Sequence, residues 1–247
     1  MDAKLGMMII LFLGGFAAGV INVLAGGGSF LTLPLLGLFG LPPSVANATN
    51  RIGILLQNIS ATGTFIKKKQ INIRDLYLAI PTILGSILGT TIVLKLPENI
   101  VKISLGIIFL VMSYFVLFSP KVWEEGKDLK KKNRLISFTV FFLIGLYGGY
   151  IQAGVGFFLI YALTMLEGYN LKSANAMKIF LTLLFTIFSL LIFSAGKKVE
   201  VFPGLVLGMG SFFGGYVGSY LNMRVNVKVI RIVVAGMMIV SSLSYLI

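Results

Sequence analysis

Long apolar runs alternate with short polar connections along the whole chain. Each half contains five such runs, and eight of the ten reach the length of about 20 residues that a helix needs to cross a bilayer. The pattern therefore predicts an all-α polytopic membrane protein. In order, the runs are Leu5–Val23, Phe30–Phe39, Ala46–Ile66, Leu76–Leu94, Ile100–Phe118, Leu135–Gln152, Phe157–Leu166, Ala174–Ala195, Val201–Leu221 and Val227–Ile247.

The second run of each half is too short to cross. Phe30–Phe39 and Phe157–Leu166 would each rise about 15 Å as a helix, which is half of the ~30 Å hydrocarbon core. Each short run follows a glycine-rich turn. We therefore expect half-helices or re-entrant segments that meet the turn inside the membrane.

The two halves are related as an internal repeat. A shift of 128 residues places Ala25–Leu31 on Ala153–Leu159, Gly40 on Gly168, and the A-N-A sequence that begins at Ala46 on the one that begins at Ala174. We interpret residues 1–119 as the first transmembrane repeat, 120–133 as a cytoplasmic linker and 134–247 as the second repeat. Together they are expected to form one integral membrane domain.

The composition supports a membrane protein and excludes several kinds of chemistry. The chain is 57% hydrophobic with a mean hydropathy of +0.97, and its charged share of 12% is half of the ~25% typical of soluble domains. It contains no cysteine and no histidine, which removes thiol nucleophiles and the commonest metal ligands. All acidic residues fall in or beside predicted loops. We therefore expect no metal, no cofactor and no enzymatic activity.

The net charge of +13 comes mainly from short loops, as the positive-inside rule describes, and does not point to nucleic acid. The richest basic stretches are Lys67–Lys69 with Arg74, and the linker, and we place both in the cytoplasm. An odd number of crossings per half puts more basic residues on that side than an even number does. The halves would then be inverted repeats in the cell membrane, with both termini outside.

The glycine turns offer backbone donors inside the membrane. A glycine run lets N–H groups converge, and a helix that starts there directs its partial positive end at the same point, which favours an anion. The alternative is that the glycines only allow close helix packing, as we expect for Gly85 with Gly89 and Gly214 with Gly218. The turn residues that would bind the anion are Gly26, Gly27, Gly28 and Ser29 in the first half, and Gly154 and Gly156 in the second.

The helix after each turn carries a polar stripe. In the first half it includes Asn47, Asn50 and Arg51, and in the second Asn175 and Lys178. Polar groups that face lipid cost free energy, so the stripes are expected to face each other or a wet cavity. The two cations have no obvious acidic partner except Glu167. An anionic substrate would neutralise them, whereas the alternative is that they are interfacial anchors.

At these residues the chain resembles the TauE/SafE family, also called the sulfite exporter family. Both halves show a glycine turn, a short apolar segment and an A-x-A-T-type helix start, which maps onto Ala46–Thr49 and, with Met177 in place of threonine, onto Ala174–Met177. The resemblance covers nearly the whole chain. It implies a multipass permease for small anions, often sulfite, sulfonates or other sulfur-containing acids.

We therefore expect a permease for a small anion that is bound between the two glycine turns near mid-membrane. Sulfite or another sulfur-containing acid is the favoured substrate, and the lipid bilayer is the surrounding partner. Backbone donors and one or two cations also fit a small carboxylate, and a non-transporting membrane assembly partner is the alternative of another class. The sequence sets neither the direction of transport nor the oligomeric state.

Overall fold

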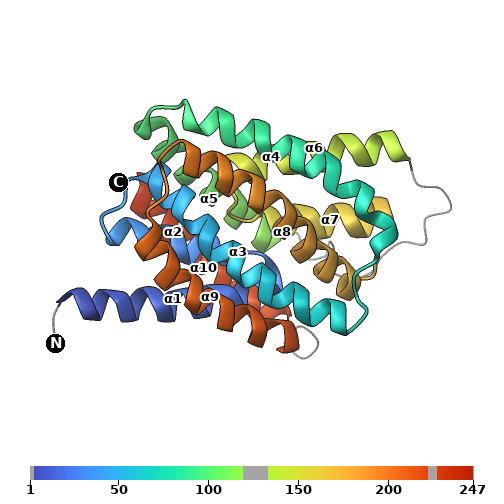
Figure 1. Ribbon diagram of the computed structural model, residues 1–247, viewed down its shortest axis with the longest axis horizontal. Helices are drawn as coiled ribbons and strands as arrows, with labels where there is room; N and C mark the ends of the chain where they lie inside the picture. Colours follow the sequence, from blue (N-terminus) through green and yellow to red (C-terminus); the bar gives the residue numbers. More distant parts are fainter. Residues whose placement is uncertain (1–2, 119–132, 222–226, 247) are drawn as a thin grey trace.

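The computed structural model describes residues 3–118, 133–221 and 227–246, which form a bundle of helices (Figure 1). The helices match the predicted apolar runs one for one, with ends that differ by a few residues. Their bounds are α1 Ala3–Ala25, α2 Ser29–Leu38, α3 Pro43–Lys67, the 3₁₀ helix η1 Ile73–Leu78, α4 Ala79–Leu94, α5 Glu98–Phe118, α6 Arg134–Tyr150, α7 Val155–Glu167, α8 Leu171–Ala195, α9 Val201–Leu221 and α10 Val227–Leu246.

The backbone confirms the repeat at its turns. Glycines with positive φ occur in pairs related by the shift of 128 residues: Gly26 and Gly154 at +89° and +76°, and Gly40 and Gly168 at +88° and +69°. A residue with a Cβ is strained in this conformation, so each repeat needs glycine at the same two places. The first pair precedes the short helix, and the second pair follows it.

Each short helix packs against the helix that precedes it. The side chain of Leu35, near the end of α2, lies against Gly14 in the middle of α1, so the two helices form an antiparallel hairpin. In the second half the Ser137 hydroxyl, near the start of α6, donates to Glu167 at the end of α7 over 2.5 Å. In both halves, the chain thus turns back inside the bundle after α1 and after α6.

The two halves run in opposite directions. Figure 1 shows the start of α1 and the end of α10 at one end of the molecule, whereas the end of α3 and the start of α6 lie at the other. Counting each hairpin as a re-entry leaves three crossing helices in each half, α3 to α5 and α8 to α10, which is the odd number that the loop charges favoured. The fold is the predicted inverted repeat. The assignment of the α3 end to the cytoplasm stays a prediction, and the linker lies outside the described residues apart from Asn133.

The halves interlock through small residues. A Cβ on Gly85 or Gly89 of α4 would collide with the α6 backbone, and one on Gly214 of α9 with the backbone of α1. A Cβ on Gly218 would lie 3.0 Å from the Cβ of Val23. These contacts bear out the expected packing role of the four glycines. Each hairpin is thus held by the fourth α-helix of the opposite half, α4 or α9.

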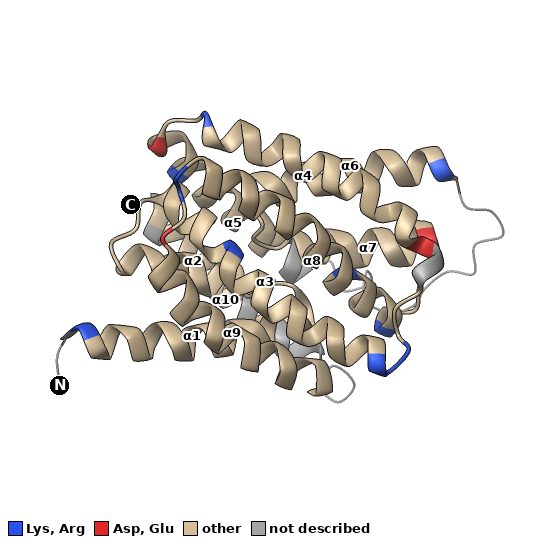
Figure 2. Cartoon of the chain, viewed as in Figure 1, with Lys and Arg blue, Asp and Glu red and all other residues tan. Residues whose placement is uncertain are grey.

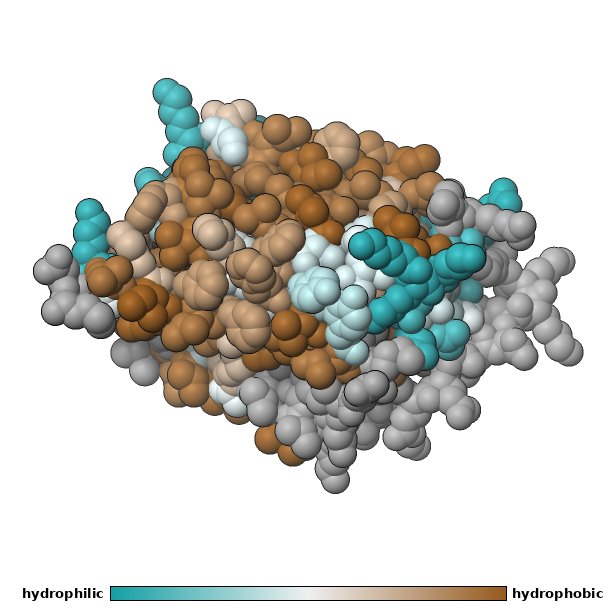
Figure 3. All heavy atoms as spheres, turned by 60° about the horizontal axis from the view of Figure 1, so that its bottom comes forward, coloured by the Kyte–Doolittle hydropathy of each residue, from teal (hydrophilic) through white to brown (hydrophobic). Residues whose placement is uncertain are grey.

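The outer surface is that of a protein surrounded by lipid. Along α4, the large apolar side chains of Ile80, Leu84 and Leu88 recur every four residues and are about half exposed. Apolar side chains cover most of the face drawn in Figure 3, and Figure 2 shows the charged residues gathered mainly at the two ends. Among the described helices, four are long and apolar enough to cross a membrane by length and composition alone: α1, the segment Asp75–Leu94, α8 and α9.

Candidate functional site

The two glycine turns meet inside the molecule. A Cβ built on Gly26 would lie 2.7 Å from the Cα of Gly156, so the two backbones are in direct contact. The sequence predicted that the turns come together, and the structure brings them together more closely than expected. The space between them is closed at this point, and the nearest open volume lies beside the turns.

The polar stripes face the interior as predicted, because Arg51 and Lys178 are 0% and 1% exposed. This excludes the alternative that they are interfacial anchors. Their polar groups instead bind helix ends. The Lys178 ammonium donates to the carbonyl oxygens of Asn22 and Val23, 3.0 and 3.2 Å away, in the last turn of α1.

Arg51 likewise binds the C-terminal end of α6, the first helix of the other hairpin. Its guanidinium donates to the carbonyl oxygens of Gly148 and Gly149, 2.6 and 3.0 Å away, in the last turn of α6, and to the Gln152 side chain over 2.6 Å. The carbonyls of a helix C-terminus lack helical partners and carry partial negative charge. The sequence indicated no obvious acidic partner for the two cations, and in the structure backbone carbonyls serve as their acceptors.

The matched asparagines reinforce these helix ends. Asn47 donates to the carbonyl oxygen of Tyr150 over 2.8 Å, and Asn175 donates to that of Val23 over 2.7 Å. Asn47 and Asn175 occupy the same place in the two repeats, and they have the same structural role. Each asparagine, together with a nearby cation, holds the end of a hairpin helix from the opposite half.

Two small polar cavities lie beside the glycine turns, and both are lined by Asn22 and Ile54. Each has a volume of about 10 Å³, which is room for about one water molecule. The first, which we name the lysine cavity, is lined by Asn22, Ile54, Asn58, Gln152, Val155, Gly156, Lys178, Ile179 and Thr182. The second, the serine cavity, is lined by Ala18, Asn22, Gly28, Ser29, Thr32, Asn50, Gly53, Ile54, Gln57 and Ser211.

A chain of amides leads to the lysine cavity. Asn22 donates to Gln57 over 3.2 Å, and Gln57 donates to the side-chain oxygen of Asn58 over 3.0 Å. The Nδ2 group of Asn58 is fully buried and has no acceptor among the described residues. An unpaired buried donor costs about 1–3 kcal/mol, so this amide indicates a place where a ligand or water supplies the acceptor.

Polar side chains that line the serine cavity form hydrogen bonds with one another. Thr32 donates to the Asn50 oxygen over 2.7 Å, and Asn50 donates to the Ser29 hydroxyl over 3.2 Å. These three residues come from α2 and α3, and their hydrogen bonds give partners to the polar side chains near the start of α2. Part of the turn is likewise used internally, because the amide of Phe30 donates to the Gly27 carbonyl over 3.2 Å.

Several lining residues were not predicted as site residues. Asn22 and Gln152 were read as parts of apolar runs, and Gln57 as part of the α3 helix. Asn58 and Thr182 belong to the same helix faces as the predicted polar stripes. The available signal was position: Asn22 precedes Gly26 by four residues, and Gln152 precedes Gly154 by two. A polar residue just before a break in a membrane helix lies close to the backbone groups that the break leaves without helical partners.

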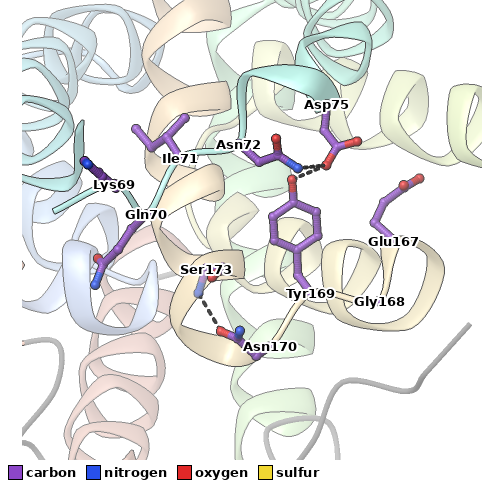
Figure 4. A pocket seen from close by; sticks show the side chains of 10 residues that line it. All are labelled: Lys69, Gln70, Ile71, Asn72, Asp75, Glu167, Gly168, Tyr169, Asn170 and Ser173. Atoms are coloured by element: carbon purple, nitrogen blue, oxygen red, sulfur yellow. Dashed lines mark hydrogen bonds between the residues drawn. The ribbon is translucent and has the colours of Figure 1, made fainter. Parts of the chain in front are cut away.

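A larger pocket of about 470 Å³ opens where α3 joins η1 and α7 joins α8 (Figure 4). We name it the end crevice. The Tyr169 hydroxyl donates to Asp75 over 2.5 Å, and burial together with this bond raises the pKa of the Tyr169 phenol, so it remains a donor. The lining residues are Lys69, Gln70, Ile71, Asn72, Asp75, Glu167, Gly168, Tyr169, Asn170 and Ser173.

Within the described residues, no carboxylate lines either of the two cavities. Asp75 and Glu167 line the end crevice, and Glu98 accepts from Ser44 and pairs with Lys198 over 3.1 Å. In the described part of the chain, no three histidine, cysteine or acidic residues gather as a metal site would require. The lining of the lysine cavity therefore combines one cation with amide and hydroxyl groups.

Comparisons with known proteins agree with this architecture. The profile described as "Sulfite exporter TauE/SafE" matches residues 11–245. A probable membrane transporter protein of Haemophilus influenzae is 30% identical, covering 99% of this chain and 97% of the relative, and the probable membrane transporter protein YfcA of Escherichia coli K12 is 32% identical, covering 90% and 83%. The comparison with solved structures finds no match. The chain belongs to the TauE/SafE sulfite exporter family and is a multi-pass membrane transporter of the cell membrane.

Proposed function

We propose that the chain is a permease for a small anion, which binds in the lysine cavity between Lys178 and Asn58. The observation that carries the proposal is the Nδ2 group of Asn58, a fully buried donor without an acceptor among the described residues. It lines the same cavity as a lysine, and no carboxylate is among the lining residues. An anion supplies the missing acceptor and the missing negative charge together.

Lys178 retains a donor for this anion. An ammonium group has three N–H bonds, and the carbonyls of Asn22 and Val23 accept two of them. The third is available to a ligand. A hydrogen bond between an ionised donor and an anion is about twice as strong as a neutral one, so this N–H and the Asn58 amide favour an oxyanion over water.

The predicted site residues divide into four groups under this proposal. Gly156 and Lys178 line the lysine cavity, whereas Gly28, Ser29 and Asn50 line the serine cavity beside it. Gly26, Gly27 and Gly154 shape the turns, and Asn47, Arg51 and Asn175 hold the hairpin ends. Gly156 also makes room for the cation, because a Cβ there would lie 3.1 Å from the Cδ of Lys178.

The substrate that we propose is sulfite or another small sulfur-containing acid. Three observations support this choice: the family description, the donor groups of the cavity, and its small size. A cavity that holds about one water molecule must widen to admit sulfite, so the structure represents a closed state. Inverted repeats around a central site provide such a movement by displacement of one half against the other.

We propose that transport of the anion is not coupled to a proton carried by a carboxylate of the protein. Because no carboxylate of the described residues lines either cavity, we assign no carboxylate proton relay and no catalytic step to the chain. The anion moves down its gradient or carries its own proton.

Transport by purified protein in liposomes tests the function. Uptake of sulfite, a small sulfonate and acetate should be measured for the wild type, for Asn58→Leu, and for the matched control Asn99→Leu, which changes an exposed asparagine of α5. We expect sulfite uptake by the wild type and the control, and strong loss in Asn58→Leu. Acetate uptake without sulfite uptake would change the substrate to a carboxylate. Absence of any uptake, with capture of a membrane partner, would support the assembly alternative.

A further inference from the structure

Along α8, an apolar stretch separates a residue of the end crevice from a residue of the lysine cavity. Ser173 lines the crevice, and Thr182 lines the cavity. Between them at the same three-residue spacing lie Ala176 and Ile179, which are buried in an apolar cluster. These positions turn gradually around the helix, so polar, apolar and polar levels follow one another along its axis.

The facing helix α3 repeats this order. Asn58 lines the lysine cavity, Ala61 and Phe65 belong to the same apolar cluster, and Lys69, just after the helix, lines the crevice. The spacings of three and four residues keep Asn58, Ala61 and Phe65 on one face of α3, which ends at Lys67, two residues before Lys69. Two helices from different repeats therefore present the same three levels to each other.

The apolar level is a continuous cluster of buried side chains. We name it the apolar plug, and it consists of Val23, Ala61, Phe65, Ala176 and Ile179, all of them buried, with Ile71 packed against it. Ile71 also lines the end crevice, and Ile179 also lines the lysine cavity. The plug thus touches both volumes and separates them.

We propose that the apolar plug is the closed gate of the substrate pathway, and that the end crevice is the mouth through which the anion enters or leaves the lysine cavity. The inference rests on the proposed function and adds the route and its barrier. An apolar constriction excludes water, and an anion that has no water or donor around it cannot pass. Opening therefore requires the plug residues to separate.

The residues of the plug are placed so that relative movement of the halves would separate them. Val23, Ala61 and Phe65 belong to the first half, whereas Ala176 and Ile179 belong to the second. The crevice is bridged in the same way, because Tyr169 donates to Asp75 and Tyr77 donates to Glu167 over 2.8 Å. Both bonds join the two repeats, so opening at this end would break them together with the plug.

Cysteine accessibility tests the gate directly, since the natural chain contains no cysteine. Purified full-length Ser173→Cys and Thr182→Cys are reacted with a negatively charged methanethiosulfonate reagent, and the labelling rates are measured. Ser173→Cys should react quickly and Thr182→Cys slowly. Adding Phe65→Ala to Thr182→Cys should raise its labelling rate by about tenfold or more, because removal of the ring opens a cavity through the plug.

Phe141→Ala is the matched control, because this buried phenylalanine of α6 belongs to a different apolar cluster. It should not accelerate the labelling of Thr182→Cys. Ile179→Ala is a second plug variant, which should act like Phe65→Ala and covers the case in which one of them fails to fold. Equal labelling of Thr182→Cys with and without a folded plug variant would overturn the gate, as would an unreactive Ser173→Cys.

The outcome separates this inference from the proposed function, because the labelling rate is measured without sulfite and reports only access to the cysteine. Faster labelling in the plug variants without sulfite uptake by the wild type would preserve the gate and reject sulfite as the substrate. Sulfite uptake with unchanged labelling would preserve the permease and reject this route.

Discussion

The ammonium group of Lys178 in α8 lies 3.0 Å from the carbonyl oxygen of Asn22 in the last turn of α1. A cation of one repeat thus donates hydrogen bonds to the C-terminal carbonyls of a helix in the other repeat, at the edge of the lysine cavity. The same contact supports the hairpin and positions a charge for an anion. Substitutions at Lys178 are therefore expected to affect both folding and binding.

Lys178→Gln should weaken sulfite binding by ~1–3 kcal/mol, the usual value of a hydrogen bond to a charged group. It should also lower the melting temperature in detergent, because the carbonyls at the end of α1 lose their cation. Lys178→Arg is the conservative control and should retain more of both properties. Unchanged sulfite affinity in a folded Lys178→Gln protein would remove this residue from the binding site.

Arg51→Gln should lower the stability of the protein more than its affinity for sulfite. Its guanidinium holds the end of α6 through the Gly148 and Gly149 carbonyls and lines neither cavity. We expect a stability loss of about 3 kcal/mol or more, since several bonds to a charged group disappear at a buried site. Thermal unfolding and sulfite titration of the same preparation measure the two effects. A loss of affinity at full stability would show that Arg51 contacts the anion directly.

Gly214→Leu should destabilise the bundle, because the Cβ would collide with the backbone of α1. Gly63→Leu is the matched control, since a Cβ at Gly63 meets nothing within 4 Å. Melting temperatures of the two variants provide the comparison. If Gly214→Leu kept its stability and only transport failed, α9 would belong to the site and not to the scaffold.

The orientation of the chain can be tested with single cysteines. A cysteine at Lys69, after α3, should react only with reagent in the cytoplasm, and a cysteine at Lys95, after α4, only with reagent outside. The prediction follows from the basic residues near the end of α3 and from the opposite directions of α3 and α4. Labelling of the Lys69 position from outside intact cells would reverse the topology.

The sequence predicted the helices and the repeat closely, because both depend on local patterns. Apolar runs defined the helices, and the two glycine turns defined the hairpins. The buried polar stripe of α3 was also correct, since lipid does not accommodate Asn47 or Asn50. These features are properties of neighbouring residues and need no knowledge of tertiary contacts.

The partners of the polar side chains could not be predicted in the same way. Lys178 and Arg51 bind main-chain carbonyls of distant helices, and such acceptors leave no mark in the side-chain pattern. The lysine cavity arises where α1, α3, α7 and α8 meet, so Asn22 and Gln152 join the site only through tertiary packing. The predicted turn residues lie next to the cavity because the same turns bring these helices together.

The central claim is that one anion is held jointly by Asn58 and Lys178. Equilibrium binding of sulfite to the purified wild type, Asn58→Leu, Lys178→Gln and the double variant tests it most directly, with Asn99→Leu as control. Each single variant should lose about tenfold or more in affinity, and the double variant should lose less than the two losses combined, because both groups act on one ligand. Wild-type sulfite affinity in folded Asn58→Leu and Lys178→Gln proteins would contradict the account.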